Sequence, residues 1–224
     1  KYPDPKQAYY IDLLELALEE TKQEYGGYSL QAIPVEMTQG RTSIMVELDR
    51  GIDVTWRMTT ADYEQRMLAI YFPLLKGMMG SRVFIIRGDE QNLFPKNISL
   101  SSLGQMIAGQ GHDWPDNTIL KHNKLTITTG ANHTLLDMLD KGRFDYFPRA
   151  LHEPWIEIKD NSKFTVEKNL MLQYPAPLYF FVNKNNLLLR DRITLGLNKA
   201  LNNGKFDKFF NEHLITRDTL DRAN

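Results

Sequence analysis

The chain has 224 residues, of which 42% are apolar and 25% charged, a composition typical of a soluble globular protein with a sizeable core. Its 27 basic and 28 acidic side chains give a formal net charge of -1, which argues against nucleic acid and anionic membrane surfaces as partners. The chain has no cysteine, which excludes disulfides, thiol nucleophiles and cysteine-bound zinc.

The predicted elements alternate between helices and strands along the chain. Helices are predicted from apolar side chains at three- and four-residue spacing, and strands from short apolar runs. In chain order they are helix 8–25, strand 28–36, helix 40–48, strand 52–56, a helical turn through Arg66, strand 83–86, helix 100–106, strand 106–108, a helix starting near Pro115, strand 125–129, helix 133–139, strand 144–147, strand 179–182 and helices 188–201 and 206–213. Such alternation predicts an α/β architecture.

The two most hydrophobic predicted strands, around Val83 and Tyr179, lie at the ends of a long intervening segment. A segment inserted between two strands can form a second lobe that is reached by two crossings. The cleft between two such lobes is a favoured place for a small ligand. The sequence therefore predicts one lobe of residues 1–87 and 179–224, a second of residues 88–178, and a hinge at the two crossings, near 87–90 and 175–178.

Several short motifs occur in an order and spacing that resemble one protein family. They are Gly51-Ile-Asp-Val54, Thr59-Thr60 with Arg66, Phe72-Pro-Leu-Leu-Lys-Gly77, Gly142-Arg-Phe-Asp145 and Leu201-Asn-Asn-Gly-Lys-Phe-Asp-Lys-Phe209. With these motifs the chain resembles the extracellular solute-binding proteins of family 3, which are type II periplasmic binding proteins of the amino-acid type. More narrowly, segments 109–116 and 145–149 resemble a branch of transporter substrate-binding domains. Members usually open with a strand and an aromatic-proline loop, so we expect the first strand to be trimmed here.

The resemblance implies a fold and a function. The implied fold is the two-lobed α/β fold of periplasmic binding protein-like II, in which two crossover strands form the hinge. We expect a periplasmic monomer, its signal peptide absent from this chain, that closes its lobes around a small polar, anionic or amino-acid-like solute for an ABC-type transporter permease. No enzymatic activity and no cofactor are expected. Two alternatives stay open, because fold does not settle role: a ligand-sensing module with a signalling partner, and a dehydratase-like enzyme.

Arg66 is the first candidate for ligand binding. Its planar guanidinium can hold a carboxylate by two parallel hydrogen bonds, which give orientation as well as affinity. In the amino-acid-binding members of the family, the arginine after the threonine turn binds the ligand carboxylate. The alternative interpretation is a surface arginine that pairs with Asp62 or Glu64 on its own turn.

Four further residues of the first lobe are candidates. Thr59 and Thr60 offer hydroxyls and backbone N–H groups to an anion at a helix start, or they act as N-caps, Thr59 with Asp62 giving the capping signal. Trp56 provides an aromatic wall for a ligand or a core side chain. Tyr2 is a candidate because family ligands are often held between aromatic rings.

In the second lobe the segment Gln110-Gly111-His112-Asp113-Trp114 is predicted as a loop before a helix. Glycine allows close backbone approach, and a helix start presents unpaired N–H groups to an anion. His112 and Asp113 with Asp116 are also residue types that can bind zinc. No His-x-x-x-His spacing is present and Pro115 interrupts the segment, so we expect no metal.

Arg149 departs from the pattern of the amino-acid binders, which usually have an acid in this region for the ligand ammonium. If Arg149 faces the cleft, the ligand carries a second anionic group or lacks an amine. One alternative is that Asp113 takes the ammonium instead. Another is that Arg149 is a structural or solvated side chain.

Overall fold

The computed structural model describes residues 5–33 and 37–223. The chain divides into two compact units, Lys1–Gly77 with Ala176–Asn224 and Met78–Pro175. Within the described ranges, no helix is long and apolar enough to cross a membrane.

The two crossings between the units follow Gly77 and Pro175. The sequence places them at 87/88 and 178/179, because it assigns the strand around Val83 to the first lobe. In the structure this strand pairs with three strands of the second unit. Gly77 has a φ of 89°, a left-handed conformation that glycine adopts at no steric cost.

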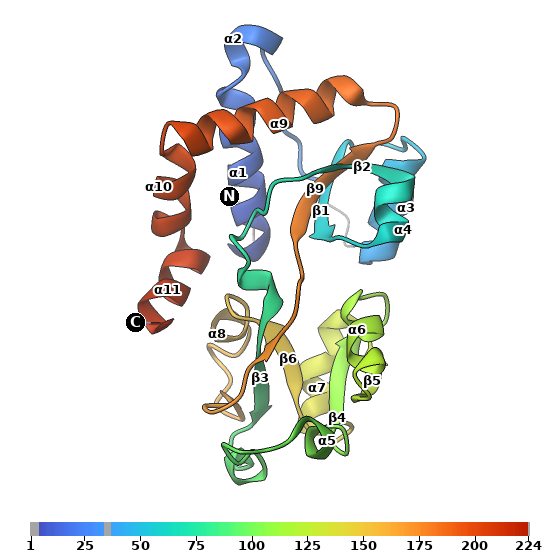
Figure 1. The fold of residues 1–224 in the computed structure, drawn as a ribbon, viewed down its shortest axis with the longest axis vertical. Helices are drawn as coiled ribbons and strands as arrows, with labels where there is room; N and C mark the ends of the chain where they lie inside the picture. The colour runs from blue at the N-terminus through green and yellow to red at the C-terminus, as the bar shows by residue number, and fades with distance from the viewer. Residues whose placement is uncertain (1–4, 34–36, 224) are drawn as a thin grey trace. The chain divides into compact units, whose positions relative to one another are not determined.

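The first unit is built on an antiparallel three-stranded sheet in the order β1-β9-β2, against which helices pack (Figure 1). The central strand β9 pairs on both sides, so that Phe180 lies opposite both Trp56 and Ile70. The elements of this unit are α1 (Pro5–Glu19), α2 (Lys22–Tyr25), α3 (Gln39–Glu47), β1 (Val54–Met58), α4 (Ala61–Arg66), β2 (Met67–Ile70), β9 (Leu178–Asn183), α9 (Leu187–Asn202), α10 (Lys205–Glu212) and α11 (Leu214–Ala223).

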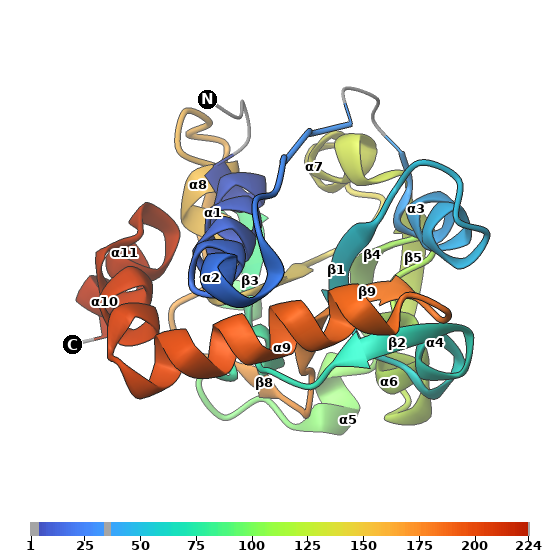
Figure 2. The ribbon, with the colours of Figure 1, turned by 90° about the horizontal axis from the view of Figure 1, so that it is seen from above.

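Helix α9 crosses α1 at close range, as Figure 2 shows. A Cβ added at Gly196 of α9 would lie 1.9 Å from the backbone oxygen of Ala17 in α1. Only glycine therefore allows the two helix backbones to approach this closely. The buried side chains of α1 include Tyr9, whose hydroxyl donates a 2.7 Å hydrogen bond to the carbonyl of Leu74.

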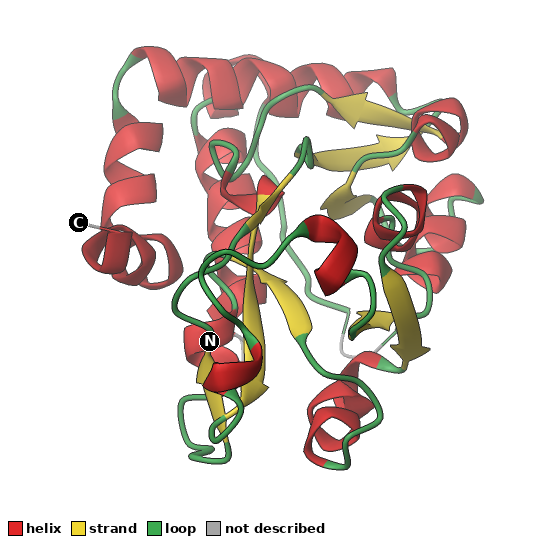
Figure 3. Ribbon diagram, turned by 60° about the horizontal axis from the view of Figure 1, so that its bottom comes forward, coloured by secondary structure: helices red, strands yellow, loops and turns green. Residues whose placement is uncertain are grey.

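The second unit contains a sheet in the order β6-β3-β7, with β8 also paired to β3, and a parallel pair, β4-β5 (Figure 3). An isolated parallel bridge joins Ala108 of β4 to Tyr146, next to β6. The elements are η1 (Met78–Gly80), β3 (Ser81–Arg87), η2 (Gln91–Leu93), α5 (Leu100–Leu103), β4 (Ile107–Gly111), α6 (Asp116–His122), β5 (Thr126–Gly130), η3 (Asn132–Thr134), α7 (Leu135–Asp140), β6 (Phe147–Ala150), α8 (Pro154–Glu157), β7 (Phe164–Val166) and β8 (Leu172–Gln173).

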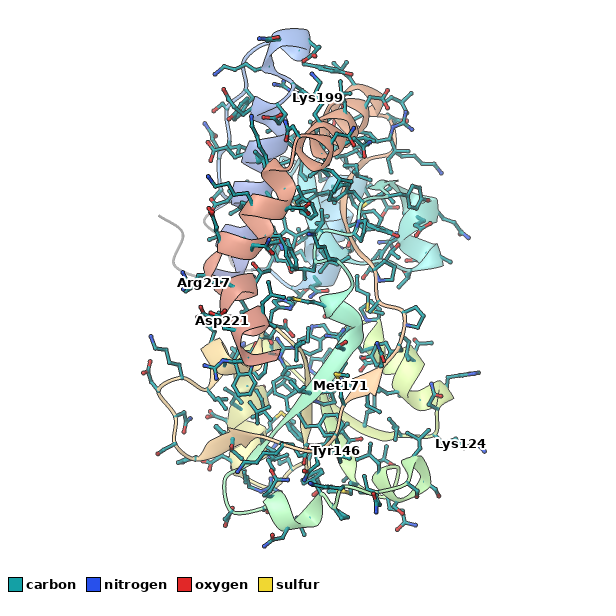
Figure 4. The ribbon with its side chains drawn as sticks, turned by 60° about the vertical axis from the view of Figure 1, so that its left-hand side comes forward. Lys124, Tyr146, Met171, Lys199, Arg217 and Asp221 are labelled. Carbon is teal, nitrogen blue, oxygen red and sulfur yellow. The ribbon has the colours of Figure 1, made fainter. Side chains whose placement is uncertain are left out.

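The core of the second unit has two apolar clusters. One gathers around Phe84, Phe94 and Tyr146, the last of which is labelled in Figure 4. The other includes Phe144 and Phe147, with Trp114 packed against it. Complete burial of each large apolar side chain contributes about 1.5–3 kcal/mol, so these clusters fix the strands that carry the candidate site.

The predicted strand 28–36 is wrong for its described part. Residues 28–33 form no regular structure and are mostly exposed, and 34–36 lie outside the described residues. A strand needs a hydrogen-bonding neighbour, and this segment has none in the sheets of the first unit. Tyr28 instead donates a 3.0 Å hydrogen bond to Glu19.

The structure also adds elements that the sequence pattern does not predict. Strand β2 follows α4 directly and is formed by pairing with β9, far away in the sequence. A third terminal helix, α11, follows the two predicted ones and buries Ile215, Thr216 and Thr219. The short elements α8, β7 and β8 lie in a region where no element is predicted.

Candidate functional site

Arg66 is the last residue of α4, and its side chain is 32% exposed. Its Nη1 lies 3.4 Å from the Asp62 carboxylate and its Nε 3.3 Å from that of Glu47. The Nε makes no hydrogen bond of good geometry with any described residue. The predicted pairing with Asp62 is therefore present, with Glu47 of α3 as a second partner. Both contacts are long and partly exposed, so each contributes little to stability.

Thr59 and Thr60 fix the turn that precedes α4. Thr60 is the N-cap: its hydroxyl accepts a 3.1 Å hydrogen bond from the backbone N–H of Tyr63. The helix therefore begins one residue later than the capping signal of Thr59 predicts. The Thr59 hydroxyl instead donates a 2.6 Å hydrogen bond to Glu64. The backbone N–H of Thr59 donates to the carbonyl of Pro177, which ties the turn to the residue before β9.

Trp56 is half-buried on β1 and packs against other aromatic rings. Its ring stacks on Tyr10 with centroids 5.2 Å apart and meets the edge of Phe180 at 6.5 Å. These contacts fit the interpretation of Trp56 as a core side chain. Tyr2, the other aromatic candidate, lies outside the described residues.

Gln110 and Gly111 are the last two residues of strand β4, not part of a loop as predicted. Both are buried, because β4 runs between β5 and the segment that leads into β6. The Oε1 of Gln110 has no hydrogen-bond partner within the described part of the chain. A Cβ added at Gly111 would lie 2.3 Å from the Trp114 indole, so glycine is required here for the tryptophan to fold back onto the strand.

The exposed part of this segment is His112 and Asp113, which begin the connection from β4 to α6. We call residues 112–115 the β4–α6 loop. The backbone N–H of His112 donates to the carbonyl of Gly130, and its Nδ1 lies 3.0 Å from the Thr129 hydroxyl of β5. The Asn117 amide donates to the carbonyls of Gly111 and His112, at 2.8 and 3.2 Å. The loop is therefore held in place from both sides.

No group of three or more histidine, cysteine, aspartate or glutamate side chains within residues 5–33 and 37–223 could hold a metal ion.

Arg149 lies on β6 and is buried. Its Nε and Nη2 donate to the two carboxylate oxygens of Glu157 at 2.8 and 2.6 Å, and Nη2 also lies 2.8 Å from Glu153. Burial alone would lower the pKa of this guanidinium, but the carboxylates of Glu153, Glu157 and Asp116 together raise it above its ordinary value. The geometry fits the interpretation of Arg149 as a structural side chain, because carboxylates of the protein already neutralise its charge.

A second buried charged group, around Arg82 of β3, was not predicted. Its Nη2 lies 2.7 Å from Asp116, the first residue of α6, and its Nε donates a 3.0 Å hydrogen bond to the Tyr174 hydroxyl. That hydroxyl in turn donates to Asp116. Burial, the largest cause, raises the pKa of Tyr174 above its ordinary value. The three residues come from distant parts of the sequence, so no local motif could have indicated this group.

Arg57 is a further buried cation that the sequence assigned to a polar loop. It lies on β1 with 2% of its surface exposed, and its guanidinium carbon lies 4.9 Å from the centre of the Tyr63 ring. Its Nη2 donates a 3.3 Å hydrogen bond to Thr55. A polar run after a strand gives no indication that the strand continues through it.

No family model and no curated protein matches the sequence. Solved structures do match it. An ancestral arginine-binding protein bound to glutamine is 16% identical, with a TM-score of 0.68, over 92% of this chain and 87% of that chain. The substrate binding protein of an amino acid ABC transporter is 14% identical, with a TM-score of 0.65, over 92% of this chain and 87% of that chain. An ancestral amino acid-binding protein, a precursor of cyclohexadienyl dehydratase, is 15% identical, with a TM-score of 0.65, over 92% of this chain and 84% of that chain.

These comparisons confirm the predicted fold class. The chain has the α/β fold of the two-lobed periplasmic amino-acid-binding proteins along nearly its whole length.

Proposed function

We propose that this chain is a periplasmic solute-binding protein that captures a small polar solute with a carboxylate, as an amino acid has, for an ABC-type transporter. The observation that carries the proposal is the fold, shared over 92% of the chain with an arginine-binding protein bound to glutamine and with the substrate binding protein of an amino acid ABC transporter. Fold alone does not determine function, so the side chains of each unit must supply the recognition.

In the first unit, Arg66 is the proposed partner of the solute carboxylate. Its contacts with Glu47 and Asp62 are longer than the 2.7–2.9 Å typical of strong charge-assisted hydrogen bonds. A solute carboxylate can displace such contacts at little cost, because partly exposed ion pairs contribute about 0–1 kcal/mol. Thr59 and Thr60 are proposed to support the same carboxylate.

In the second unit, the β4–α6 loop is proposed to contact the same solute. Asp113 is exposed there and is the proposed partner of a solute ammonium. Arg149 would be the partner of a second anionic group on the solute, but it already has Glu153 and Glu157 as partners. We therefore propose a solute without a second anionic group. A zwitterionic α-amino acid therefore fits better than a dicarboxylate.

A thermal-shift screen followed by calorimetric titration tests the proposal. The purified chain, freed of carried-over ligand by unfolding and refolding, is screened against the L-amino acids, succinate and dipeptides. We expect an L-amino acid to raise the melting temperature and succinate to leave it unchanged. Any ligand found is also incubated with the protein and analysed by mass spectrometry, since one structural neighbour is a dehydratase precursor. Binding without turnover is the expected result.

The Arg66→Ala variant should lose this binding and keep its fold. Arg190→Ala is the matched control, because Arg190 is also a partly exposed arginine of the first unit, paired with Asp191. The proposal fails if no compound binds, and the assignment of Arg66 fails if Arg66→Ala binds as tightly as Arg190→Ala.

A further inference from the structure

The ion-pair group of Arg149 with Glu153 and Glu157 is unusually complete for a buried site. Glu157 receives two hydrogen bonds from the guanidinium, and the second carboxylate oxygen of Glu153 accepts a 2.8 Å hydrogen bond from the backbone N–H of Ala150. The guanidinium therefore has one fixed position and plane. The side chain of Arg149 is only 6% exposed, so solvent does not compete for these hydrogen bonds.

Stability does not account for such a group. Removing charged groups from water costs about as much as their mutual attraction returns, and apolar replacements of whole buried groups are often neutral or stabilising. A fixed buried cation can instead give conformational specificity to its neighbours.

Two aromatic rings lie against the guanidinium of Arg149. Its Cζ is 4.9 Å from the ring centre of Trp114 and 4.9 Å from that of Phe147. The two rings are nearly parallel, with an angle of 14° and centroids 6.1 Å apart. Phe147 is buried on the same strand as Arg149, whereas Trp114 is half-buried in the β4–α6 loop. Of the two rings, Trp114 is therefore the one that no strand holds, and besides Arg149 its indole contacts Gly111 and the cluster of Phe144 and Phe147.

We propose that Arg149 is a positioning residue that holds the Trp114 indole in one orientation, so that the β4–α6 loop presents a fixed aromatic surface to the solute. The role of that surface rests on the proposed function, whereas the fixing of the indole does not. Lysine cannot replace arginine here, because a compact ammonium lacks both the plane that lies against the rings and the fork that binds Glu157.

Fluorine NMR of the protein labelled with 5-fluorotryptophan tests the fixing of the indole directly. The chain has three tryptophans, so three resonances are expected, and the variants Trp114→Phe and Trp56→Phe assign two of them. In the wild-type protein we expect one sharp Trp114 resonance. In Arg149→Lys we expect it to broaden or split, while the resonance of Trp56, in the other unit, stays unchanged.

Arg87→Lys is the matched control. Arg87 is a partly buried arginine of β3 whose Nη1 donates to the carbonyls of Leu139 and Phe144 and whose Nη2 lies 2.7 Å from the Glu90 carboxylate. We expect Arg87→Lys to leave the Trp114 resonance sharp even if it lowers the melting temperature. An unchanged Trp114 resonance in Arg149→Lys, or equal broadening in Arg87→Lys, overturns the proposal.

If Arg149→Lys does not fold, a second variant tests the same proposal. Arg149→Met with Glu153→Gln and Glu157→Gln removes the guanidinium together with its two nearest carboxylates. Arg82, which lies 3.9 Å from Glu153, keeps Asp116 as its ion-pair partner at 2.7 Å. The Trp114 resonance should broaden or split in this variant too, and a sharp unshifted resonance overturns the proposal.

Titration with L-glutamine supplies the functional measurement. We expect its dissociation constant to rise about tenfold in Arg149→Lys, which corresponds to about 1.4 kcal/mol, and to change less than twofold in Arg87→Lys. Equal dissociation constants in the two variants overturn the role in solute binding. If neither L-glutamine nor another amino acid binds the wild-type protein, the proposed function fails, and the fluorine spectra still decide whether Arg149 fixes Trp114.

Discussion

Arg66 and Arg149 have opposite surroundings, and the difference decides what each can bind. Arg66 is 32% exposed with N–O distances of 3.3 and 3.4 Å, whereas Arg149 is 6% exposed with distances of 2.6 and 2.8 Å. Displacing a partner from a buried pair leaves an uncompensated charge, at a cost of about 3–5 kcal/mol. A solute anion would meet no such cost at Arg66, and for this reason Arg66, and not Arg149, is the proposed partner of a solute carboxylate.

The same reasoning predicts a large effect at Arg82. Its side chain is 3% exposed, and Arg82→Leu would leave the Asp116 carboxylate buried without its ion-pair partner. We expect the free energy of unfolding to fall by about 3–5 kcal/mol, and the double variant Arg82→Leu with Asp116→Leu to recover most of it. Urea denaturation of both single variants and the double variant measures the coupling.

The Lys163–Asp140 pair of the same unit is the control, because its side chains are 63% and 36% exposed. Asp140→Ala should cost less than about 1 kcal/mol. If Arg82→Leu lowered the free energy of unfolding as little as Asp140→Ala does, burial would add nothing to the strength of the Arg82–Asp116 pair.

His213 predicts a pH dependence of stability. It lies between α10 and α11 with the Tyr9 and Phe209 rings at 4.9 and 5.3 Å and the Asp12 carboxylate at 3.7 Å. Burial lowers the pKa of His213 below 6.5, and Asp12 opposes the shift only in part. The folded protein therefore favours the neutral ring. The stabilisation is fully present above pH 6.5 and is lost as the pH falls through the lowered pKa.

Urea unfolding above and below pH 6.5 measures this effect. His213→Gln should flatten the acid-side loss of stability, because the group that takes up the proton on unfolding is gone. His122→Gln, at an exposed position, should retain the wild-type pH profile. A wild-type profile in His213→Gln would assign the acid-side loss to carboxylates instead.

At the scale of elements, the crossing of α1 and α9 depends on Gly196. Alanine is the better helix former by about 1 kcal/mol, but its Cβ would meet the Ala17 carbonyl oxygen at 1.9 Å. Backbone atoms cannot move aside as a flexible side chain can, so the two helices must separate. We expect Gly196→Ala to lower the free energy of unfolding by about 1–3 kcal/mol.

Thermal denaturation compares Gly196→Ala with Gly27→Ala, where no atom lies within 4 Å of an added Cβ. Gly27→Ala should change the melting temperature little. A Gly196→Ala protein as stable as the wild type would mean that the helices are packed less closely than the structure gives.

Elements were predictable from sequence where local pattern and tertiary pairing agree. The strand predicted at 179–182 lies within the central strand β9, Leu178–Asn183, and the helix start predicted with Thr59 as cap is capped one residue later, by Thr60. Strand β2 was missed because four residues after a helical turn show no period of their own, and pairing with β9 makes them a strand.

At the scale of the whole molecule, the fold was predictable because several motifs occur in one order, and structural comparison confirms it. The site was predictable only as a set of residue types. Whether Arg149 meets a solute or Glu157 depends on α8, a four-residue helix without a clear sequence signal. The Arg82 group was beyond prediction because its members come from β3, α6 and the residue after β8.

A bound solute should add stability to the chain. A solute that binds only the folded state adds about 2.7 kcal/mol at a hundredfold excess over its dissociation constant. If side chains of both units contact the same amino acid, Arg66→Ala in the first and Asp113→Asn in the second should each remove most of this gain. Calorimetric melting with and without ligand measures it for each variant.

Asp89→Asn, an exposed aspartate of the second unit, is the control for Asp113→Asn and should retain the full gain in stability. The double variant Arg66→Ala with Asp113→Asn should lose little more than either single one, because residues that hold one ligand together are not additive. If Asp113→Asn retained the full gain while Arg66→Ala lost it, solute recognition would belong to the first unit, and Asp113 would have no part in it.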